Sequence, residues 1–465
     1  MADQRPALPA DRIGVLAARR ISDGDVFELG GLHLQRDDVQ WLLAAAAARG
    51  DGATPLRLRE VDATGADLSG LRLDGVDLSG ARLAEANMQR ASLRGANLTE
   101  AVLTGAECEH ADFRDARLAS AVLDRCGLMW ARLDGATLTH TSLIGASMPD
   151  ACFDRADLLQ ADLTGAYLGA ASLVEANLLG ARMRDAQMIW CRLERATLSA
   201  ADLTGATLWR ARLDGANVSE ALLDRANLSE AHLEGANFAG ASLLLANLSR
   251  AFLDGATDLT GIRAGSGGEN GLIVADAHWN DANLTTFAWS EVRQLGDETV
   301  ARRADGKQGR PTRAEAYVLA ARASRQVAKE LSGRGMTEEA NRFAYRAQVA
   351  QRRAFLHAGP RRAPQYLFSV FLSTLSGYGY RPSRGLIAYL TCIGTFAALY
   401  HAFGAGLTGL EAFVVSVTAF HGRGFFPDTF APGDPLSIIA AGEAFVGLII
   451  EVVLIATITQ RLFGK

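Results

Sequence analysis

The chain has few cysteines and few histidines, and neither type is spaced as a set of ligands. Its five Cys residues show no metal-binding or disulfide spacing, and its eight His residues are scattered. No Ser-His-Asp set, H-E-x-x-H, Walker or dinucleotide-binding pattern is present. We therefore expect neither an enzyme nor a protein that binds a metal or another cofactor.

Lysine is missing from the central part of the chain. Residues 66–255 contain Arg but no Lys, and acidic residues outnumber basic ones there, whereas residues 302–362 are strongly basic. The first 20 residues lack a long apolar run, so we expect no cleaved signal peptide. A chain of 465 residues has room for several domains.

A five-residue unit recurs without a phase break from residue 66 to residue 255. Its first position is mostly Ala and its third mostly Leu, while Asp and Asn favour the second, as in Ala66-Asp67-Leu68. On a helix, five residues advance about 500°, so the Leu side chains would spread over every face. On a plain strand, an odd period sends alternate Leu side chains to opposite faces. Each unit must therefore contain its own turn, which predicts a solenoid with four units per coil. Cys126 and Cys191 take Ala positions, and we expect them to be small buried residues.

The unit resembles the A(D/N)LXX motif of the pentapeptide-repeat family. This resemblance implies a right-handed quadrilateral β-helix with Leu and Ala inside, of about nine to ten coils and roughly 45 Å long. Residues 20 apart then share a column, which places Trp130, Ile189, Trp190 and Trp209 together on an outward face. A contiguous apolar patch indicates a partner or subunit contact, and the alternative is isolated surface aromatics.

Changes in this pattern define the expected domains. These are an N-terminal cap (1–60), the β-helix (61–262), short repeats in a shifted register with a linker (263–310), a cytoplasmic helical hairpin (311–358), and an interfacial helix with a two-span pore domain (359–465). Apolar residues at helical spacing predict the two hairpin helices at 312–331 and 337–356. The hairpin resembles one tetratricopeptide-like unit.

Two apolar segments near the end of the chain, 385–403 and 436–459, are long enough to cross a bilayer. Segment 366–375 predicts an interfacial amphipathic helix. Arg residues cluster before the first span and follow the second, and Arg423 is the single Arg between them. The positive-inside rule therefore predicts that both termini lie in the cytoplasm.

Between the spans, a short apolar segment, 410–419, leads into a Gly-rich stretch, which is typical of a re-entrant pore loop. The layout resembles the two-transmembrane-helix, potassium-channel-like pore domain, and it implies a hinge at Gly447. The pore-loop and filter positions that the resemblance implies are Thr418, Ala419, Phe420, His421, Gly422, Arg423, Gly424 and Phe425. Taken whole, the chain resembles bacterial pentapeptide-repeat proteins that carry an ion-channel domain.

Two residues depart from the potassium-channel pattern. Arg423 stands in place of the filter Tyr, and His421 is an extra residue. Rings of carbonyls select potassium while rings of Arg favour anions, so the ion selectivity stays open. Segment 375–380, Leu-Ser-Gly-Tyr-Gly-Tyr, mimics a filter better, but it precedes both spans and we interpret it as a turn.

Glu443, Gly447 and Glu451 are four residues apart, so they form one stripe of the second span. Ionisable residues inside a membrane usually face a cavity or a partner. For Glu443 the alternative is a position near the interface, and for Glu451 a pairing with Arg423 or His421 is open.

Two functions fit these predictions. The first is an ion channel, expected to be a homotetramer in contact with membrane lipids and a permeating ion, with a β-helix that senses a cytoplasmic protein or ligand. The second is a membrane-anchored binding scaffold, including the DNA-mimic type found among pentapeptide-repeat proteins. Because acidic and Arg residues are interspersed, the field of the shaft should be weak. We expect no nucleic-acid partner.

Overall fold

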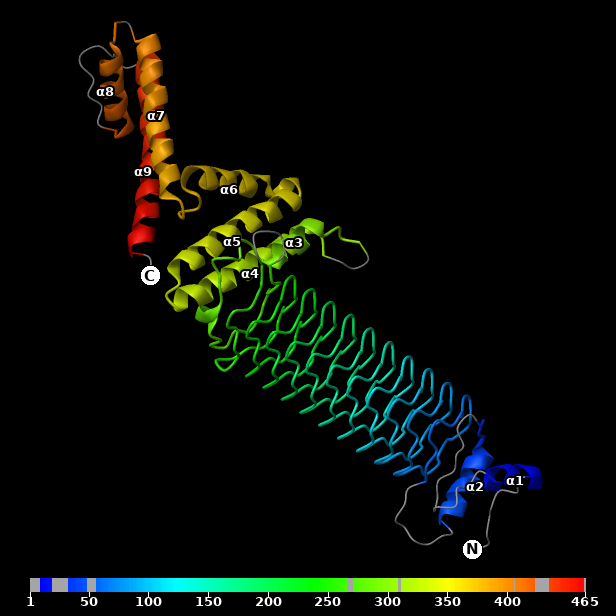
Figure 1. Ribbon diagram of the computed structural model, residues 1–465. Coiled ribbons are helices and arrows are strands. Elements are labelled where there is room, and N and C mark those ends of the chain that lie inside the picture. Colours follow the sequence, from blue (N-terminus) through cyan, green and yellow to red (C-terminus); the bar gives the residue numbers. More distant parts are fainter. Residues whose placement is uncertain are drawn as a thin grey trace. The chain divides into compact units, whose positions relative to one another are not determined.

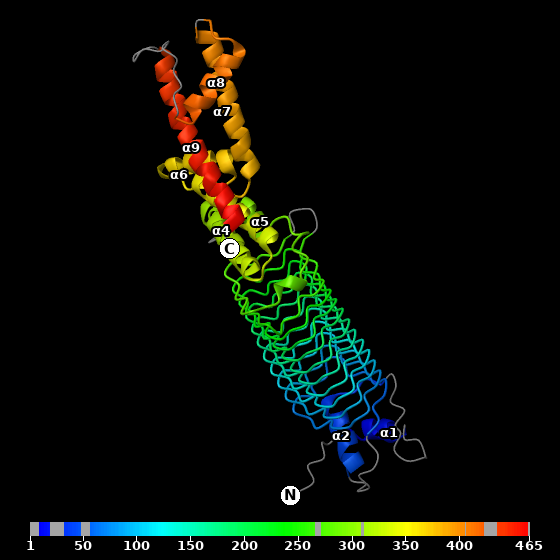
Figure 2. The ribbon, with the colours of Figure 1, turned by 90° about the vertical axis from the view of Figure 1, so that its left-hand side faces the viewer.

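The computed structural model describes residues 9–18, 32–47, 56–265, 271–307, 311–404, 406–422 and 435–463. The chain forms two compact units, residues 1–299 and 300–465. Coils make up most of the first unit and helices make up the second (Figures 1 and 2).

The first unit is a solenoid with 20 residues in each coil. Parallel bridges join the second position of each unit to the residue 20 further along, as in Asp67↔Asn87 and Asp162↔Arg182. Within residues 56–265 these are single-residue bridges separated by turns, and no longer strands form. The solenoid expected from the period of five is confirmed, and each of its four sides is one bridge wide.

Each five-residue unit ends in a tight turn. The first N–H of the next unit donates to the carbonyl at position 3, as from Leu71 N to Leu68 O at 3.3 Å. Position 5, the third residue of the turn, has φ between 54° and 73° in every unit from Glu60 to Arg250. Type II turns require such a left-handed residue, which glycine adopts most easily. Trp130 and Trp190 also occupy this position, with φ of 56°.

Backbone hydrogen bonding explains why position 2 favours Asp and Asn. Backbone N–H groups at positions 2, 3 and 5 donate to adjacent coils, and that of position 1 closes the turn. The N–H of position 4 has no backbone acceptor in this pattern. Asp67 Oδ1 accepts the N–H of Ser69 at 3.0 Å, and Asn247 Oδ1 accepts that of Ser249 at 3.0 Å. Where position 2 is Asp or Asn, its side chain thus completes the hydrogen bonding of its unit. In some other units an Asp of the preceding coil accepts this N–H, as Asp124 does from Ile144.

The interior of the solenoid is filled by the side chains of positions 1 and 3. Ala161 and Leu163 are fully buried, as are their counterparts along the shaft. Cys126 and Cys191 are buried as expected, and their thiols donate to the carbonyls of Ala106 and Ala171 in the preceding coil. Each buried Leu contributes about 1.5–3 kcal/mol.

The N-terminal end of the solenoid is covered by apolar side chains. Helices α1 (Ala10–Ala18) and α2 (Arg36–Ala47) lie on the N-terminal side, where Leu34 and Leu42 are fully buried. The bridge ladder continues past residue 262, where the repeat pattern places its end, because Phe252 bridges His278. The bridging interval grows from 20 to 26 residues there, so added residues loop out of the coil without ending the ladder.

The residues after the ladder are largely helical. The elements are η1 (Leu284–Thr286), α3 (Gly296–Arg303), α4 (Arg313–Gly333), α5 (Thr337–His357), η2 (Pro360–Arg362), α6 (Ala363–Ser376), α7 (Pro382–Phe403), α8 (Gly409–Phe420) and α9 (Pro435–Phe463). Helices α4 and α5 form the expected hairpin, which begins with a capping box between Thr312 and Glu315. Residues 377–380 form a turn, as we interpreted segment 375–380, whose first two residues are the last two of α6.

Candidate functional site

Helices α6 to α9 have a polarity opposite to that of a water-soluble fold. Their exposed side chains include Leu367, Phe368, Ile387, Leu390, Phe403, Leu410, Phe413, Ile438, Phe445, Leu448, Val452 and Ile455. Their buried polar side chains are Ser369, Ser373, Ser376, Ser416, Glu443 and Thr457. An apolar surface of this extent is suited to lipid or to another subunit rather than to water.

Helix α6 shows this inversion within four turns. Leu367, Phe368 and Phe371 are exposed on one face, while Ser369 and Ser373 are buried on the other. A helix that lies in the plane of a membrane turns its apolar face toward the acyl chains. The exposed face of α6 has the composition expected for the predicted interfacial helix.

Helices α7 and α9 are each long and apolar enough to cross a membrane, over Pro382–Phe403 and Leu436–Thr459. Only 11% of the most apolar stretch of α7 and 22% of that of α9 are buried within the protein. A core helix of a soluble protein would be mostly buried, so these helices are suited to lipid contact instead.

Helix α8 is too short to cross. Its 12 residues extend about 18 Å, little more than half of a hydrocarbon core about 30 Å thick. It begins with a capping box between Thr408 and Glu411, and it packs against both α7 and α9 (Figure 1). Its last residue, Phe420, lies against Gly447 near the middle of α9, where an added Cβ would be 2.2 Å from the Phe420 carbonyl oxygen. Helix α8 therefore lies alongside α7 and α9 and ends near the middle of α9.

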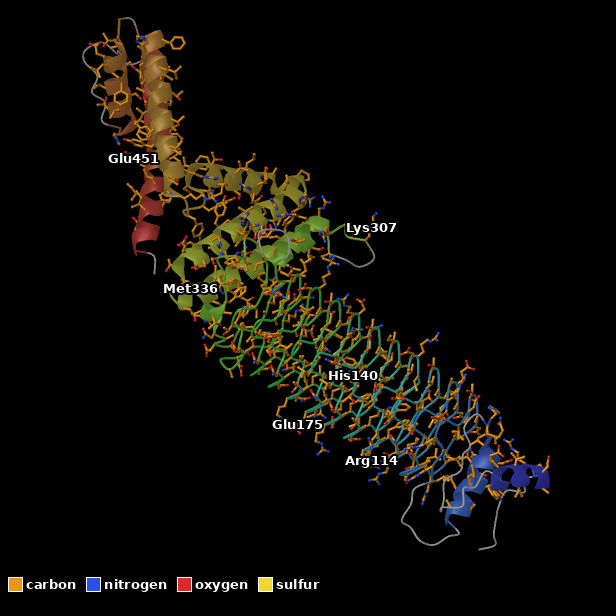
Figure 3. All side chains as sticks on the ribbon, viewed as in Figure 1. Arg114, His140, Glu175, Lys307, Met336 and Glu451 are labelled. Carbon is orange, nitrogen blue, oxygen red and sulfur yellow. The ribbon has the colours of Figure 1, made fainter. Side chains whose placement is uncertain are left out.

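The predicted stripe of α9 faces α8. Glu443 is fully buried, and its Oε1 lies 2.5 Å from Ser416 Oγ. Glu451, labelled on α9 in Figure 3, pairs with Nδ1 of His421 at the end of α8. Nε2 of the same ring lies 3.0 Å from the hydroxyl of Tyr389 in α7. We call Tyr389, His421 and Glu451 the mid-span triad.

Gly447 lies at a close helix contact. The resemblance implied a hinge there, yet α9 is helical on both sides of Gly447 and its missing side chain makes room for the end of α8. The sequence did not single out Ser416, which contacts Glu443, or Tyr389, which contacts His421. For Ser416 a signal was present, because it is a polar residue in the middle of a mostly apolar helical segment.

The predicted pore-loop residues are described in part. Thr418, Ala419 and Phe420 form the last turn of α8, with Ala419 and Phe420 buried. His421 and Gly422 form the turn that follows, and Gly422 has a left-handed φ of 65°. Arg423, Gly424 and Phe425 lie outside the described residues.

The predicted partner surface of the solenoid consists of two aromatic clusters. Trp130, 49% exposed, stacks on His110 at 4.7 Å between ring centroids. Trp190, 52% exposed, lies 5.6 Å from Trp209, over which Arg210 is placed. The two clusters are three coils apart. Ile189, beside Trp190, is half-buried.

Between the two clusters the column has smaller side chains. Pro149 and Ala170 occupy the turns of the intervening coils, and the ring of Tyr167 lies over Gly169. The column predicted from the 20-residue spacing therefore has two aromatic ends and a middle of smaller side chains.

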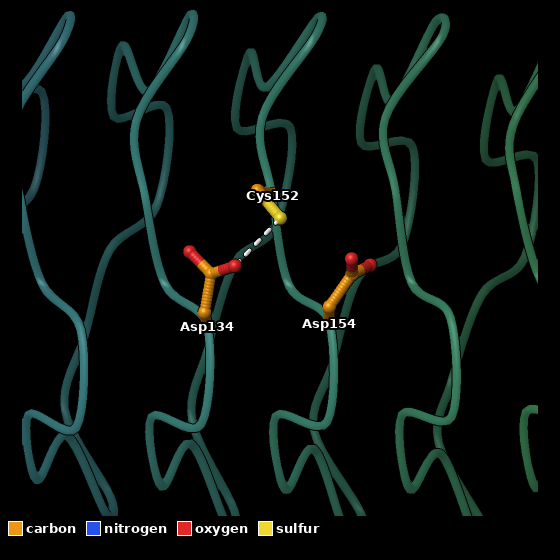
Figure 4. Close-up of side chains that lie close together, drawn as sticks. All are labelled: Asp134, Cys152 and Asp154. Carbon is orange, nitrogen blue, oxygen red and sulfur yellow. Dashed lines mark hydrogen bonds between the residues drawn. The ribbon is translucent and has the colours of Figure 1, made fainter.

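Asp134, Cys152 and Asp154 lie close enough together to share a metal ion (Figure 4). Cys152 Sγ donates to Asp134 Oδ1 at 3.0 Å, and Ser172 makes the same contact with Asp154 in the next coil at 2.5 Å. Burial, together with the contact to Asp134, raises the pKa of the Cys152 thiol to about 12, whereas a metal ligand is a thiolate. We interpret this cluster as a structural link between coils.

The comparisons with known proteins concern the solenoid. Models of pentapeptide repeats match residues 57–80, 81–119, 121–160, 161–199, 191–228 and 221–257. No curated protein matches the chain. The chain is 30% identical to HetL, a pentapeptide repeat protein involved in heterocyst differentiation regulation from the cyanobacterium Nostoc sp. strain PCC 7120; the match covers 50% of this chain and 93% of HetL, with a TM-score of 0.38.

Two further solved structures match less of the chain. Rfr23 from the cyanobacterium Cyanothece 51142 is 33% identical over 24% of this chain and 63% of its own, with a TM-score of 0.18. QnrB1, a plasmid-mediated fluoroquinolone resistance protein, is 17% identical over 43% of this chain and 92% of its own, with a TM-score of 0.24. The TM-scores of all three matches are low, so the family of this chain is assigned from the repeat models and from the sequence identity to HetL. The chain belongs to the pentapeptide-repeat family, whose members fold as right-handed β-helices, and it carries two apolar helices that could cross a membrane.

Proposed function

We propose that this protein is the subunit of a membrane ion channel. Helices α7 and α9 would span the bacterial cytoplasmic membrane, α8 and the residues after it would form a re-entrant pore loop, and the solenoid would be a cytoplasmic regulatory arm. The observation that carries this proposal is the end of α8 in mid-span, at the contact between Phe420 and Gly447. Backbone that ends a helix at this depth is tolerated where it is buried in protein or lines a water-filled cavity.

The mid-span triad supports an assembly of several copies. The side chains of His421 and Glu451 are still 35% and 31% exposed in the single chain. At the depth of the middle of α9, such groups would contact lipid, which is costly for ionisable side chains. Contact with a neighbouring copy or with pore water removes this penalty, and a pore of this layout is expected to need four copies.

The charges near the end of α8 favour different ions. The C-terminal end of α8 carries the negative end of the helix dipole, and Glu451 lies beside it, so both favour cations. Arg423 follows within a few residues, and a ring of Arg would favour anions. Replacing Arg423 with Tyr is expected to raise the permeability of cations relative to anions. An unchanged ratio would show that Arg423 does not line the pore.

The test of the proposal is ion flux through the full-length protein in sealed vesicles of phosphatidylethanolamine and phosphatidylglycerol. We expect flux from the wild type, altered flux from Gly447→Leu, and wild-type flux from the matched Gly442→Leu, because an added Cβ at Gly442 meets no atom within 4 Å. Folded, fully incorporated protein without flux over a range of voltages and lipid mixtures would refute the channel.

A membrane-anchored scaffold is the second candidate, and the two Trp clusters of the solenoid favour it. Exposed Trp residues are frequent anchors of protein interfaces. Under this proposal, Trp130→Ala with Trp190→Ala would abolish binding of a cytoplasmic protein while vesicles show no flux. In the channel, a ligand of the solenoid regulates the pore only if it binds one pore state more tightly than the other.

A further inference from the structure

Ser416 connects α8 to both spans. Its hydroxyl oxygen lies 2.9 Å from the main-chain oxygen of Ile393 in α7 and 2.5 Å from Oε1 of Glu443 in α9. Both distances lie within the range of O–H···O hydrogen bonds. Ser416 and Glu443 are both fully buried, so water does not compete for these contacts.

The two contacts of the Ser416 hydroxyl need two hydrogens, and the second one can come only from a protonated Glu443. A serine hydroxyl has one hydrogen and can donate to one acceptor at a time. The carbonyl of Ile393 can only accept, and an ionised Glu443 could also only accept. One of the two short contacts would then join two acceptors with no hydrogen between them. If Glu443 is protonated, its carboxyl donates to Ser416, Ser416 donates to Ile393, and both contacts are hydrogen bonds.

The surroundings of Glu443 offer no charge that would stabilise a carboxylate. Helix α7 contributes Tyr400 and Cys392, two groups that are neutral at neutral pH, and α8 contributes Ser416. Tyr400 itself belongs to a buried cluster whose other members are apolar, namely Ala412, Val415, Ala419, Leu436 and Ala440. Among the described residues Glu443 has no ion pair. The Tyr400 hydroxyl lies near its carboxyl, but within the described part of the chain neither that hydroxyl nor Oε2 has a partner within hydrogen-bond distance.

Glu451 provides the contrast within the same stripe. It lies two helical turns further along α9, it is half-exposed, and it pairs with His421. A buried carboxylate without a partner is several kcal/mol less stable than a paired one, so the two acids of one helix face are expected to differ in protonation.

We infer that Glu443 is a proton-binding site, which keeps its proton at neutral pH and uses it to join α7, α8 and α9 through Ser416. At alkaline pH the carboxyl would release this proton to water and become a carboxylate. Ser416 could then bond only one of its two neighbours, and α8 would lose one of its links to the spans. A resulting pH dependence of the pore rests on the proposed channel, whereas the protonation itself does not.

Infrared spectroscopy of the full-length protein in lipid vesicles tests the protonation directly. All proteins carry Asp297→Asn, because the raised pKa of Asp297, about 7, would give a second protonated carboxyl. In this background at neutral pH we expect the stretching band of a protonated carboxyl with Glu443 present, its loss in Glu443→Gln, and its retention in Glu451→Gln. Glutamine can still donate to Ser416, so Glu443→Gln should keep the packing of α8. No such band with Glu443 present, or an unchanged band in Glu443→Gln, would overturn the inference.

A second variant keeps the test decisive if Glu443→Gln does not fold. Ser416→Ala removes the acceptor of the Glu443 proton, so the same band should shift to higher frequency without being lost. An unshifted band would place the protonated carboxyl elsewhere and would overturn the inference.

Flux measurements separate the two proposals. The band without flux in any variant would refute the channel and leave the proton site standing. Flux without the band would refute the proton site and leave the channel standing. With both, we expect alkaline pH to change the flux of the wild type and of Glu451→Gln, and to leave that of Glu443→Gln unchanged.

Discussion

Replacing Gly447 with alanine is expected to push α8 away from α9. The new Cβ would lie 2.2 Å from the carbonyl oxygen of Phe420 and 3.0 Å from its carbonyl carbon. These are backbone atoms, which cannot rotate out of the way as the tip of a side chain could. A normal carbon–oxygen contact requires the end of α8 to move by roughly 1 Å.

Two opposing effects set the size of the change. Alanine is a better helix former than glycine by about 1 kcal/mol. Overpacking a buried contact costs about 1–3 kcal/mol, and a clash with backbone lies at the upper end. The net loss is about 2 kcal/mol. For a folded unit of about 150–250 residues, 1 kcal/mol corresponds to about 2–4 °C, so the unfolding midpoint should fall by roughly 4–8 °C.

Gly442→Ala is the matched control on the same helix. An added Cβ there meets no atom within 4 Å, so only the helix propensity changes. Its midpoint should rise by roughly 2–4 °C, and the two glycine variants should therefore shift in opposite directions.

The assay is the loss of helical circular dichroism on heating the full-length protein in detergent. Residues 56–265 contain no helix, so this signal follows mainly α4 to α9. If both variants shifted the midpoint equally, α8 would not press against α9 at Gly447, and the mid-span end of α8 would be wrong.

Three further predictions concern single sites. Thr408→Ala removes the capping box of α8, so the helical unit should lose about 1 kcal/mol of stability and unfold at a lower temperature. Thr408→Ser should retain the cap and the wild-type unfolding midpoint. Equal midpoints for the two variants would mean that α8 does not begin at this cap. Burial and the contact with Asp134 raise the pKa of the Cys152 thiol to about 12. At pH 8 this thiol should therefore react with maleimide roughly a thousandfold more slowly in the folded protein than after unfolding in guanidinium, as measured by mass spectrometry of its peptide. Equal rates would contradict the Asp134 contact. Burial raises the pKa of Asp297 to about 7, although the N–H groups of Val274 and Ala275 donate to it. The unfolded chain releases this proton near pH 4, so the free energy of unfolding should fall as the pH rises from about 4 to about 7 and then level off. Asp297→Asn should remove that slope from the thermal stability of the solenoid, and a slope equal to that of the wild type would contradict the assignment.

The repeat could be predicted from sequence because its physics is local. A period of five fits neither helix nor strand, so a turn in every unit follows, and every unit from Glu60 to Arg250 has the left-handed residue that such a turn needs. The helices of the second unit were also predictable, since their apolar runs and the caps at Thr312 and Thr408 mark their ends.

The contacts between distant segments were not predictable in the same way. The spacing of Glu443 and Glu451 places both on one face of α9, but it does not reveal that Ser416 and His421 face them. In the sequence, Gly447 suggests a hinge, whereas in the structure it allows close packing against the backbone of Phe420. Phe420 lies 27 residues earlier in the chain, so the sequence around Gly447 does not reveal this contact. The sequence predicts short repeats in a shifted register after residue 262, but it does not reveal that their bridges continue the same ladder, because the loops interrupt the period without interrupting the bridges.

The depth of α8 in the bilayer tests the account most directly. Nitroxide labels at Leu410, Val414 and Thr418, with Cys392 replaced by Ser, would report collisions with oxygen and with a water-soluble nickel complex in lipid vesicles. A re-entrant α8 predicts a steady increase in depth over these eight residues, by up to about 12 Å at 1.5 Å per residue. Equal depth at all three positions would mean that α8 lies flat on the membrane surface, and it would contradict the pore loop.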